Sequence, residues 1–169
     1  MSRELFILRH AKSDWGSDVS QDQLRPLNKR GRRDAPRIGA WLREHYLYPG
    51  WIYCSTAVRA RETLDAIEKE LQLPHERIVY AEMLYLASVS TLLAFLRGIP
   101  VEQNSVMLVG HNPGLDDLVN HLSSEKVPLT DSGKLMTTAC LVRFKLPDDW
   151  KELAGKGELM QIIRPAELD

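Results

Sequence analysis

The sequence has few of the residues that mark a disulfide scaffold or a membrane protein. Its two cysteines, Cys54 and Cys140, have no metal-ligand spacing; they are typical of a reducing cytosol, although one disulfide between them would also fit. No apolar run approaches the roughly 20 residues that cross a bilayer. Only four apolar residues follow the charged N-terminal segment, too few for a signal peptide. We therefore expect a cytoplasmic protein with no membrane partner.

The chain also lacks an excess of charge of either sign, since its net charge is −1. The acidic and basic residues are nevertheless unevenly distributed along it. Residues 1–61 contain 12 Lys and Arg against six Asp and Glu, whereas the remainder contains ten against 17. A basic half is consistent with a nucleic-acid surface or with a cleft that concentrates positive potential on a small anion. Composition leaves both hypotheses open.

The pattern of apolar residues predicts one domain over residues 1–169 with an α/β fold. A first helix is expected to begin after an N-cap at Asn28, with Pro36 kinking that helix or delaying its start. Further helices are expected over about 57–71, 88–97 and 115–122. Strands are expected over 5–8, 51–55, 77–81, from 105 up to His111, and around 139–146 and 158–164. Alternating strands and helices up to residue 122 predict a three-layer α/β/α sandwich with a mostly parallel central sheet.

Charged and nucleophilic side chains follow four of the expected strands. Because ligands bind beyond the carboxyl ends of the strands in such sheets, we expect these side chains to meet at one edge. In chain order they are Arg9, His10, Ser55, Arg59, Glu82 and His111.

Two guanidiniums and two imidazoles in one place suit a phosphoryl group. Arginine forks bind phosphate oxygens bidentately. A neutral imidazole can attack phosphorus and form a phosphohistidine that water hydrolyses, with its other nitrogen donating to a backbone carbonyl. A second histidine, protonated by the bound anion, would stabilise the developing charge, and a carboxylic acid at Glu82 would protonate the leaving oxygen. This chemistry requires no metal and no cofactor.

Three motifs in a fixed order carry a family resemblance: "LRH" after the first strand, "CSTAVRARETL" and "LVGHNPG". They resemble the histidine phosphatase superfamily, also called the phosphoglycerate mutase-like fold. "LRPLNKRG" and "AEMLY" are similar to the SixA-type phosphohistidine phosphatases, and the resemblance spans residues 5–163. It implies that His10 is the nucleophile and His111 the second catalytic histidine. It also implies that the phosphate is held by Arg9, Arg59 and Arg25.

Two positions depart from the family pattern or leave it open. The usual Arg-His-Gly is Arg-His-Ala here; the methyl of Ala11 could crowd the phosphate, although we expect it to be tolerated. The general acid is Glu82 or Asp14, or neither, because a departing imidazole is easily protonated and needs less help than an ester oxygen.

The length of the chain bears on the substrate. Larger members of the superfamily carry a helical cap over the site, and the 51 positions between Arg59 and His111 leave no room for one. We therefore expect an open pocket, with Trp15 at its mouth. Such a pocket favours a phosphorylated side chain of another protein, and the alternative is a small phosphate ester.

Other classes of protein fit less well. A metal hydrolase using His10, His111, Glu82 and Asp14 would place two arginines beside a cation, and no two histidines have HxH or HxxxH spacing. A nucleic-acid-binding module would use Lys29, Arg30, Arg32 and Arg33, but no aromatic residues interleave with them, and we expect no nucleic-acid partner. A non-catalytic phospho-ligand sensor would need the arginines and neither histidine.

Overall fold

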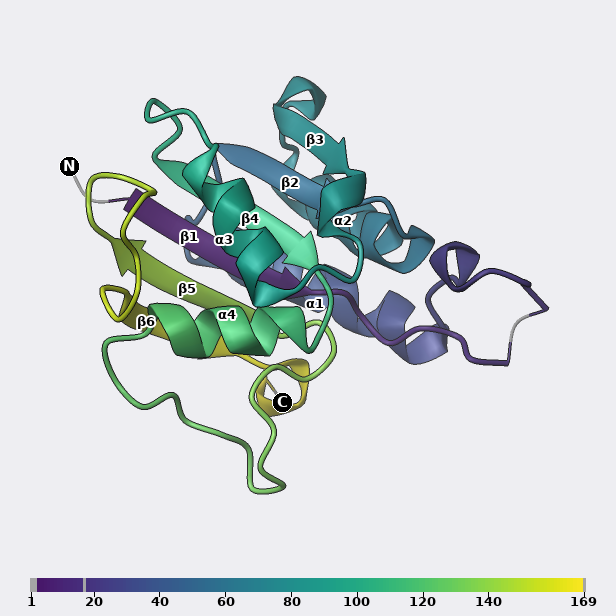
Figure 1. Ribbon diagram of the computed structural model, residues 1–169. Coiled ribbons are helices and arrows are strands. Elements are labelled where there is room, and N and C mark those ends of the chain that lie inside the picture. Colours follow the sequence, from purple (N-terminus) through teal and green to yellow (C-terminus); the bar gives the residue numbers. More distant parts are fainter. Residues whose placement is uncertain (1–2, 17, 169) are drawn as a thin grey trace.

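The computed structural model describes residues 3–16 and 18–168, which form a six-stranded sheet flanked by helices (Figure 1). The strand order is β3-β2-β4-β1-β5-β6. Strands β3, β2, β4 and β1 are parallel, β5 is antiparallel to β1, and β6 is antiparallel to β5. The predicted mostly parallel sheet is confirmed, and the antiparallel pairings involve the last two strands. The bounds are β1 (Arg3–Arg9), β2 (Trp51–Ser55), β3 (Ile78–Ala81), β4 (Ser105–Gly110), β5 (Leu141–Leu146) and β6 (Glu158–Ile163).

Strand β1 lies inside the sheet, which explains its continuous apolar run. Its residues 5–8 are almost completely buried because helices cover both faces. Val109 of β4 is paired with Leu8 of β1 on one side and with Cys54 of β2 on the other. The three strands therefore end at the same level and place the residues that follow them at one edge of the sheet.

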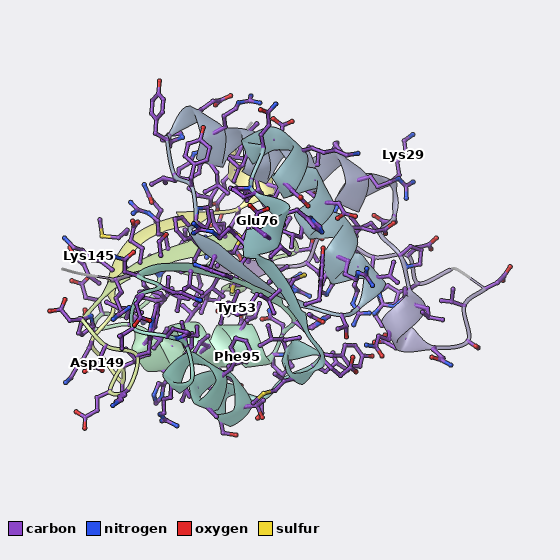
Figure 2. The ribbon with its side chains drawn as sticks, turned by 90° about the horizontal axis from the view of Figure 1, so that it is seen from above. Lys29, Tyr53, Glu76, Phe95, Lys145 and Asp149 are labelled. Atoms are coloured by element: carbon purple, nitrogen blue, oxygen red, sulfur yellow. The ribbon has the colours of Figure 1, made fainter. Side chains whose placement is uncertain are left out.

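Four helices form the outer layers. On one face α1 packs against α2, and on the other α3 packs against α4, as the view along the sheet shows (Figure 2). Tyr53 of β2 and Phe95 of α3 meet edge-on where α3 packs on the sheet. The three-layer sandwich expected from the sequence is confirmed. The helices are α1 (Lys29–Glu44), α2 (Val58–Leu71), α3 (Val89–Arg97) and α4 (Gly114–Leu122).

Helix α1 begins where its cap predicts, with the side chain of Asn28 accepting a hydrogen bond from the backbone N–H of Gly31 at 2.9 Å. Pro36 lies inside the helix, so the expectation that it would delay the start was wrong. The cap secures the first turn, and Ile38 and Leu42 on the following turns are fully buried against the α2 side of the core. Packing thus outweighs the hydrogen bond that proline removes.

Within the described segments, the chain between Arg59 and His111 forms α2, β3, α3, β4 and two short 3-10 turns, with no helical layer over the carboxyl edge of the sheet. No described helix has the length and apolar character needed to cross a membrane. Cys54 and Cys140 are both buried free thiols, so they are not joined in a disulfide.

Candidate active site

His10 follows β1 directly and its backbone is held on both sides. Its N–H donates to the carbonyl of Gly110 at the end of β4 (3.1 Å), and its carbonyl accepts from the N–H of Ala139 in the segment before β5 (3.0 Å). These bonds extend the support of the sheet one residue past β1. The imidazole of His10 is therefore carried by rigid backbone.

The ring of His10 has a defined tautomer. Nδ1 lies 2.7 Å from the carbonyl oxygen of Ala11, which can only accept, so Nδ1 carries the proton and Nε2 keeps its lone pair. Burial, and after it the neighbouring His111, Arg59 and Arg9, lower the pKa of His10 to about 3. The unliganded imidazole is thus neutral at physiological pH, and the expected carbonyl partner is present.

His111 follows β4, the strand next to β1, and its ring centroid lies 5.2 Å from that of His10. Its Nε2 is 2.7 Å from the hydroxyl oxygen of Ser55 at the end of β2. Burial first, and then the guanidinium of Arg59, lower the pKa of His111 to about 3. Both histidines are therefore uncharged when the site is empty.

Three arginines surround the histidines. Arg9, the last residue of β1, donates to the carbonyl of Met136 at 2.9 Å. Arg59, in the first turn of α2, is almost fully buried, and both of its terminal nitrogens bond to Asp22. Arg25 stacks on the Trp15 ring with 3.6 Å between its guanidinium carbon and the ring centroid. All three predicted phosphate-binding arginines converge on the histidines.

Asp22 is the charged residue that joins two of these arginines, and the sequence analysis missed it. It opens the short 3-10 turn η1 (Asp22–Leu24), and its carboxylate accepts from Arg25 and Arg59 at 2.9 Å each and from the Tyr85 hydroxyl at 2.5 Å. Tyr85 first, and then the two arginines, lower the pKa of Asp22 well below its usual range. Asp22 is therefore a permanent anion that joins both guanidiniums. Its one sequence signal is the i, i+3 spacing from Arg25.

These side chains border an open cavity of about 270 Å³. Its described lining has many hydrogen-bond donors and a single carboxylate, that of Asp22. The Nε atoms of Arg9, Arg25 and Arg59 and the Nδ1 of His111 are buried without a partner among the described residues. A cavity lined this way has an excess of donors and of positive charge that an oxyanion would satisfy. The lining comprises Arg9, His10, Lys12, Ser13, Trp15, Asp22, Arg25, Arg59, Leu86, His111, Asn112 and Thr138.

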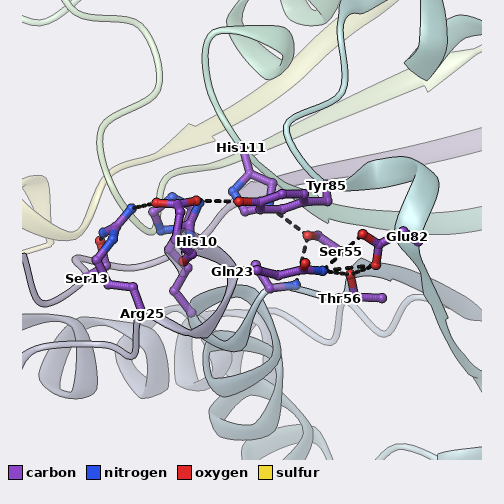
Figure 3. A network of polar contacts seen from close by, with 12 residues as sticks. His10, Ser13, Gln23, Arg25, Ser55, Thr56, Glu82, Tyr85 and His111 are labelled. Carbon is purple, nitrogen blue, oxygen red and sulfur yellow. Dashed lines mark hydrogen bonds and ion pairs between the residues drawn. The ribbon is translucent and has the colours of Figure 1, made fainter. Parts of the chain in front are cut away.

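Glu82, the first residue of η3 (Glu82–Leu84), is not part of this lining. Its fully exposed carboxylate accepts from the hydroxyl of Thr56 at 2.5 Å and from the amide of Gln23 at 3.0 Å, to one side of the histidines (Figure 3). Thr56 first, and then Gln23, lower the pKa of Glu82. Asp14 also lies outside the lining, and its carboxylate accepts from the N–H of Gly16. A general-acid role for either residue stays a prediction.

Ala11 points away from the cavity. It is fully buried in the core between the sheet and helices α1 and α2, and its N–H donates to the Thr63 hydroxyl at 2.9 Å. Its φ is not positive, so this backbone does not require glycine. The methyl group therefore does not crowd the cavity. Trp15, in contrast, lies at the mouth as expected.

Comparison with known proteins identifies the same family as the sequence motifs did. A model of the histidine phosphatase superfamily (branch 1) matches residues 5–79. An uncharacterised protein of Mycobacterium tuberculosis, Rv1276c, is 35% identical over 163 residues, covering 83% of this chain and 99% of that protein. The phosphohistidine phosphatase SixA of Escherichia coli is 27% identical over 166 residues, covering 98% and 96%. The structure of the protein histidine phosphatase SixA complexed with tungstate superposes with a TM-score of 0.81 and 23% identity, covering 98% and 99%.

The fold, the donor-rich cavity and these similarities together define a phosphatase. Within that class, the chain belongs to the histidine phosphatase superfamily.

Proposed function

We propose that this phosphatase transfers a phosphoryl group from phosphohistidine in a protein to His10 and then to water. The observation that carries the proposal is the pairing of His10 Nδ1 with the carbonyl of Ala11, which leaves a neutral Nε2 among three arginines. A neutral nitrogen held on rigid backbone beside bound phosphate is a prepared nucleophile. The tungstate complex of a SixA protein adds support, because tungstate is a tetrahedral oxyanion like phosphate.

In the first step Nε2 of His10 attacks phosphorus, and the bond between phosphorus and the substrate nitrogen breaks. The electron pair of that bond stays on the departing imidazole, which takes a proton from the solvent at the open side of the cavity and leaves neutral. In the second step water attacks phospho-His10, releasing inorganic phosphate and restoring the neutral imidazole. Arg9, Arg25 and Arg59 hold the phosphoryl oxygens through both steps.

His111 changes its charge during this cycle. In the empty site its pKa is about 3, so it is neutral. A bound phosphoryl dianion favours the protonated form and raises that pKa. Protonated His111 then stabilises the negative charge that develops on the transferred group. The arginines alone would oppose this protonation, so His111 becomes charged only when an anion is present.

The open cavity and the family relationship support a protein substrate. A phosphohistidine side chain can reach a cavity that no cap covers, whereas a small ester would find few groups around its leaving part. The name of the Escherichia coli relative indicates the same chemistry. We also propose that the reaction needs no metal ion and that the protein is cytoplasmic, in keeping with its two buried free thiols.

The test compares wild type, His10→Ala and the control His75→Ala, which removes an exposed histidine outside the cavity. Substrates are a histidine-phosphorylated protein and an aryl phosphate, each without added metal. We expect His10→Ala to lose more than about 10³-fold in rate on both. Phosphate label should be retained on wild type after an alkaline quench and be absent from His10→Ala. Hydrolysis of the aryl ester alone would overturn the proposed phosphohistidine substrate. Full activity of His10→Ala would overturn the assignment of His10 as the nucleophile.

A further inference from the structure

A second groove, of about 320 Å³, adjoins the catalytic cavity. It lies between α1 and the segments on either side of β5 and β6, and Thr138 lines both the groove and the cavity. The guanidinium of Arg30 on α1 donates to the Thr138 hydroxyl at 3.2 Å, where the two hollows meet. A ligand that fills the cavity can therefore extend into the groove.

The groove carries an excess of positive charge. Arg30, Arg33 and Arg37 lie on one face of α1, and all three approach the buried carboxylate of Asp34, at 3.9, 3.2 and 3.5 Å. The buried carboxylate of Asp34 cannot neutralise both Arg30 and Arg33, and it is shared with Arg37 as well. Arg164 adds a cation on the opposite wall, beside Glu167. Even without Arg37, the three arginines Arg30, Arg33 and Arg164 outnumber the two acids of the described lining, Asp34 and Glu167.

Arg30 and Arg33 are held in place by Asp34 but remain accessible. Asp34 is buried and holds them from below, while about half or more of the side chains of Arg30 and Arg33 remains exposed, at 54% and 65%. Guanidiniums fixed in this way lose less entropy when they bind a carboxylate than freely moving ones would. The exposed ends of Arg30 and Arg33 are therefore prepared to bind an anion.

The lining favours an acidic protein over a nucleic acid. It consists of arginines, the hydroxyls of Thr130, Thr137 and Thr138 and a few small or acidic residues, and it contains no aromatic side chain. Recognition of single-stranded nucleic acid depends on aromatic platforms for the bases. Carboxylates on an extended segment need only charge and hydrogen-bond donors, which this groove supplies.

We propose that this groove binds an acidic segment of the protein substrate that lies beside the phosphorylated side chain, and so selects among phosphoproteins. The proposal rests on the proposed function, since it assumes a phosphoprotein in the cavity. It gives a role to the basic face of α1, which the chemistry of the histidines does not require. Acidic residues would occupy the groove while the phosphoryl group contacts His10.

The test uses two phosphohistidine peptides of equal length, one flanked by Asp and Glu and the other by Asn and Gln. Exposed ion pairs change affinity by about twofold to fivefold each. We expect wild type to prefer the acidic peptide by about tenfold in kcat/KM at low salt, and the Arg30→Gln/Arg33→Gln variant by less than about threefold. Arg97→Gln, which removes an arginine of α3 outside the groove, should keep the preference. High salt should reduce it in wild type.

An unchanged preference in the Arg30→Gln/Arg33→Gln variant, or no preference in wild type, would overturn the proposal. If wild type hydrolyses neither peptide, the proposed function fails. Fluorescence anisotropy of the unphosphorylated acidic peptide then still tests whether the groove binds an acidic segment. Binding that the double substitution weakens would support it, and binding that it leaves unchanged would overturn it. Tighter binding of a single-stranded RNA of equal charge than of the acidic peptide would also overturn it.

Discussion

Acidification of the empty enzyme should destabilise it through the two histidines of the cavity. His10 and His111 both have a pKa of about 3 in the folded protein, chiefly because they are buried. In the unfolded chain each has a pKa near 6.5. Between these values the unfolded chain binds protons that the folded protein does not, so the free energy of unfolding falls as the pH falls.

The size of the effect follows from the two pKa values. Each histidine contributes stability that is fully present above about pH 6.5 and is lost progressively as the pH falls toward about 3. Between about pH 7.5 and pH 5 the loss is about 2 kcal/mol for each ring, or about 4 kcal/mol for the pair. A domain of this size has a total stability of about 5–15 kcal/mol, so the loss is large enough to measure.

Urea unfolding followed by tryptophan fluorescence at the two pH values measures it. The informative comparison is between wild type and His10→Gln/His111→Gln, because the difference cancels the titration of every other group. We expect the pH-dependent loss to be about 4 kcal/mol smaller in the double variant. His75→Gln is the matched control: it removes an exposed imidazole, leaves the two buried rings in place and should keep most of the wild-type loss. Equal losses in wild type and the double variant would refute the neutral state of the two histidines.

Four further outcomes follow from the structure. Gly31→Ala would place a methyl group 2.1 Å from the carbonyl oxygen of Lys12, beyond His10, and should lower the free energy of unfolding by about 1–3 kcal/mol in urea titrations; unchanged stability would show that the segment can move away. Asp22→Asn removes the carboxylate of the cavity lining, so inorganic phosphate should inhibit several-fold more strongly, while kcat falls because Arg59 keeps its bond to the backbone carbonyl of residue 22 but loses its charged partner; weaker inhibition would contradict this. EDTA should leave the rate unchanged, and a loss restored by one divalent ion would indicate a metal mechanism. Glu82→Gln should reduce phosphohistidine hydrolysis by less than tenfold, since Glu82 lies outside the lining, and a loss near that of His10→Ala would restore its predicted role.

The sequence predicted the elements of the fold well because their signals are local. The apolar run of residues 5–8, the cap at Asn28 and the strand of residues 51–55 each depend on neighbours within a few positions. The delayed start expected from Pro36 was wrong because the effect of proline depends on a distant partner, the packed face of α2, which outweighs the local preference. The local sequence pattern therefore predicts where an element lies, whereas tertiary packing decides whether a helix-breaking residue interrupts it.

Strand order explains why His111 lies beside His10 and Glu82 lies outside the cavity lining. Both residues follow a parallel strand, and the sequence treats them as equivalent. In the sheet, however, β4 is paired with β1, whereas β3 is the edge strand two positions further away. Glu82 therefore lies beside Thr56 and Gln23, to one side of the histidines. Asp22 was missed for a related reason, since its partners Arg59 and Tyr85 are 37 and 63 positions away in the chain.

The position of the cavity follows from the path of the chain through the sheet. After β1 the chain passes to α1 on one face, and after β4, the adjacent parallel strand, it passes to α4 on the opposite face. Neighbouring strands whose connections diverge in this way leave a crevice at their carboxyl ends, where α/β proteins bind ligands. His10 and His111 are the first residues past these two strands, so both reach this crevice without any special loop. Two of the arginines come from the α1 and α2 side, because Arg25 precedes α1 and Arg59 lies in α2, whereas Arg9 ends β1 and donates to Met136 on the α3 and α4 side. On the proposed mechanism, a phosphoryl group in this crevice is bound by arginines from both sides and attacked by His10, and the open side of the cavity admits the protein substrate.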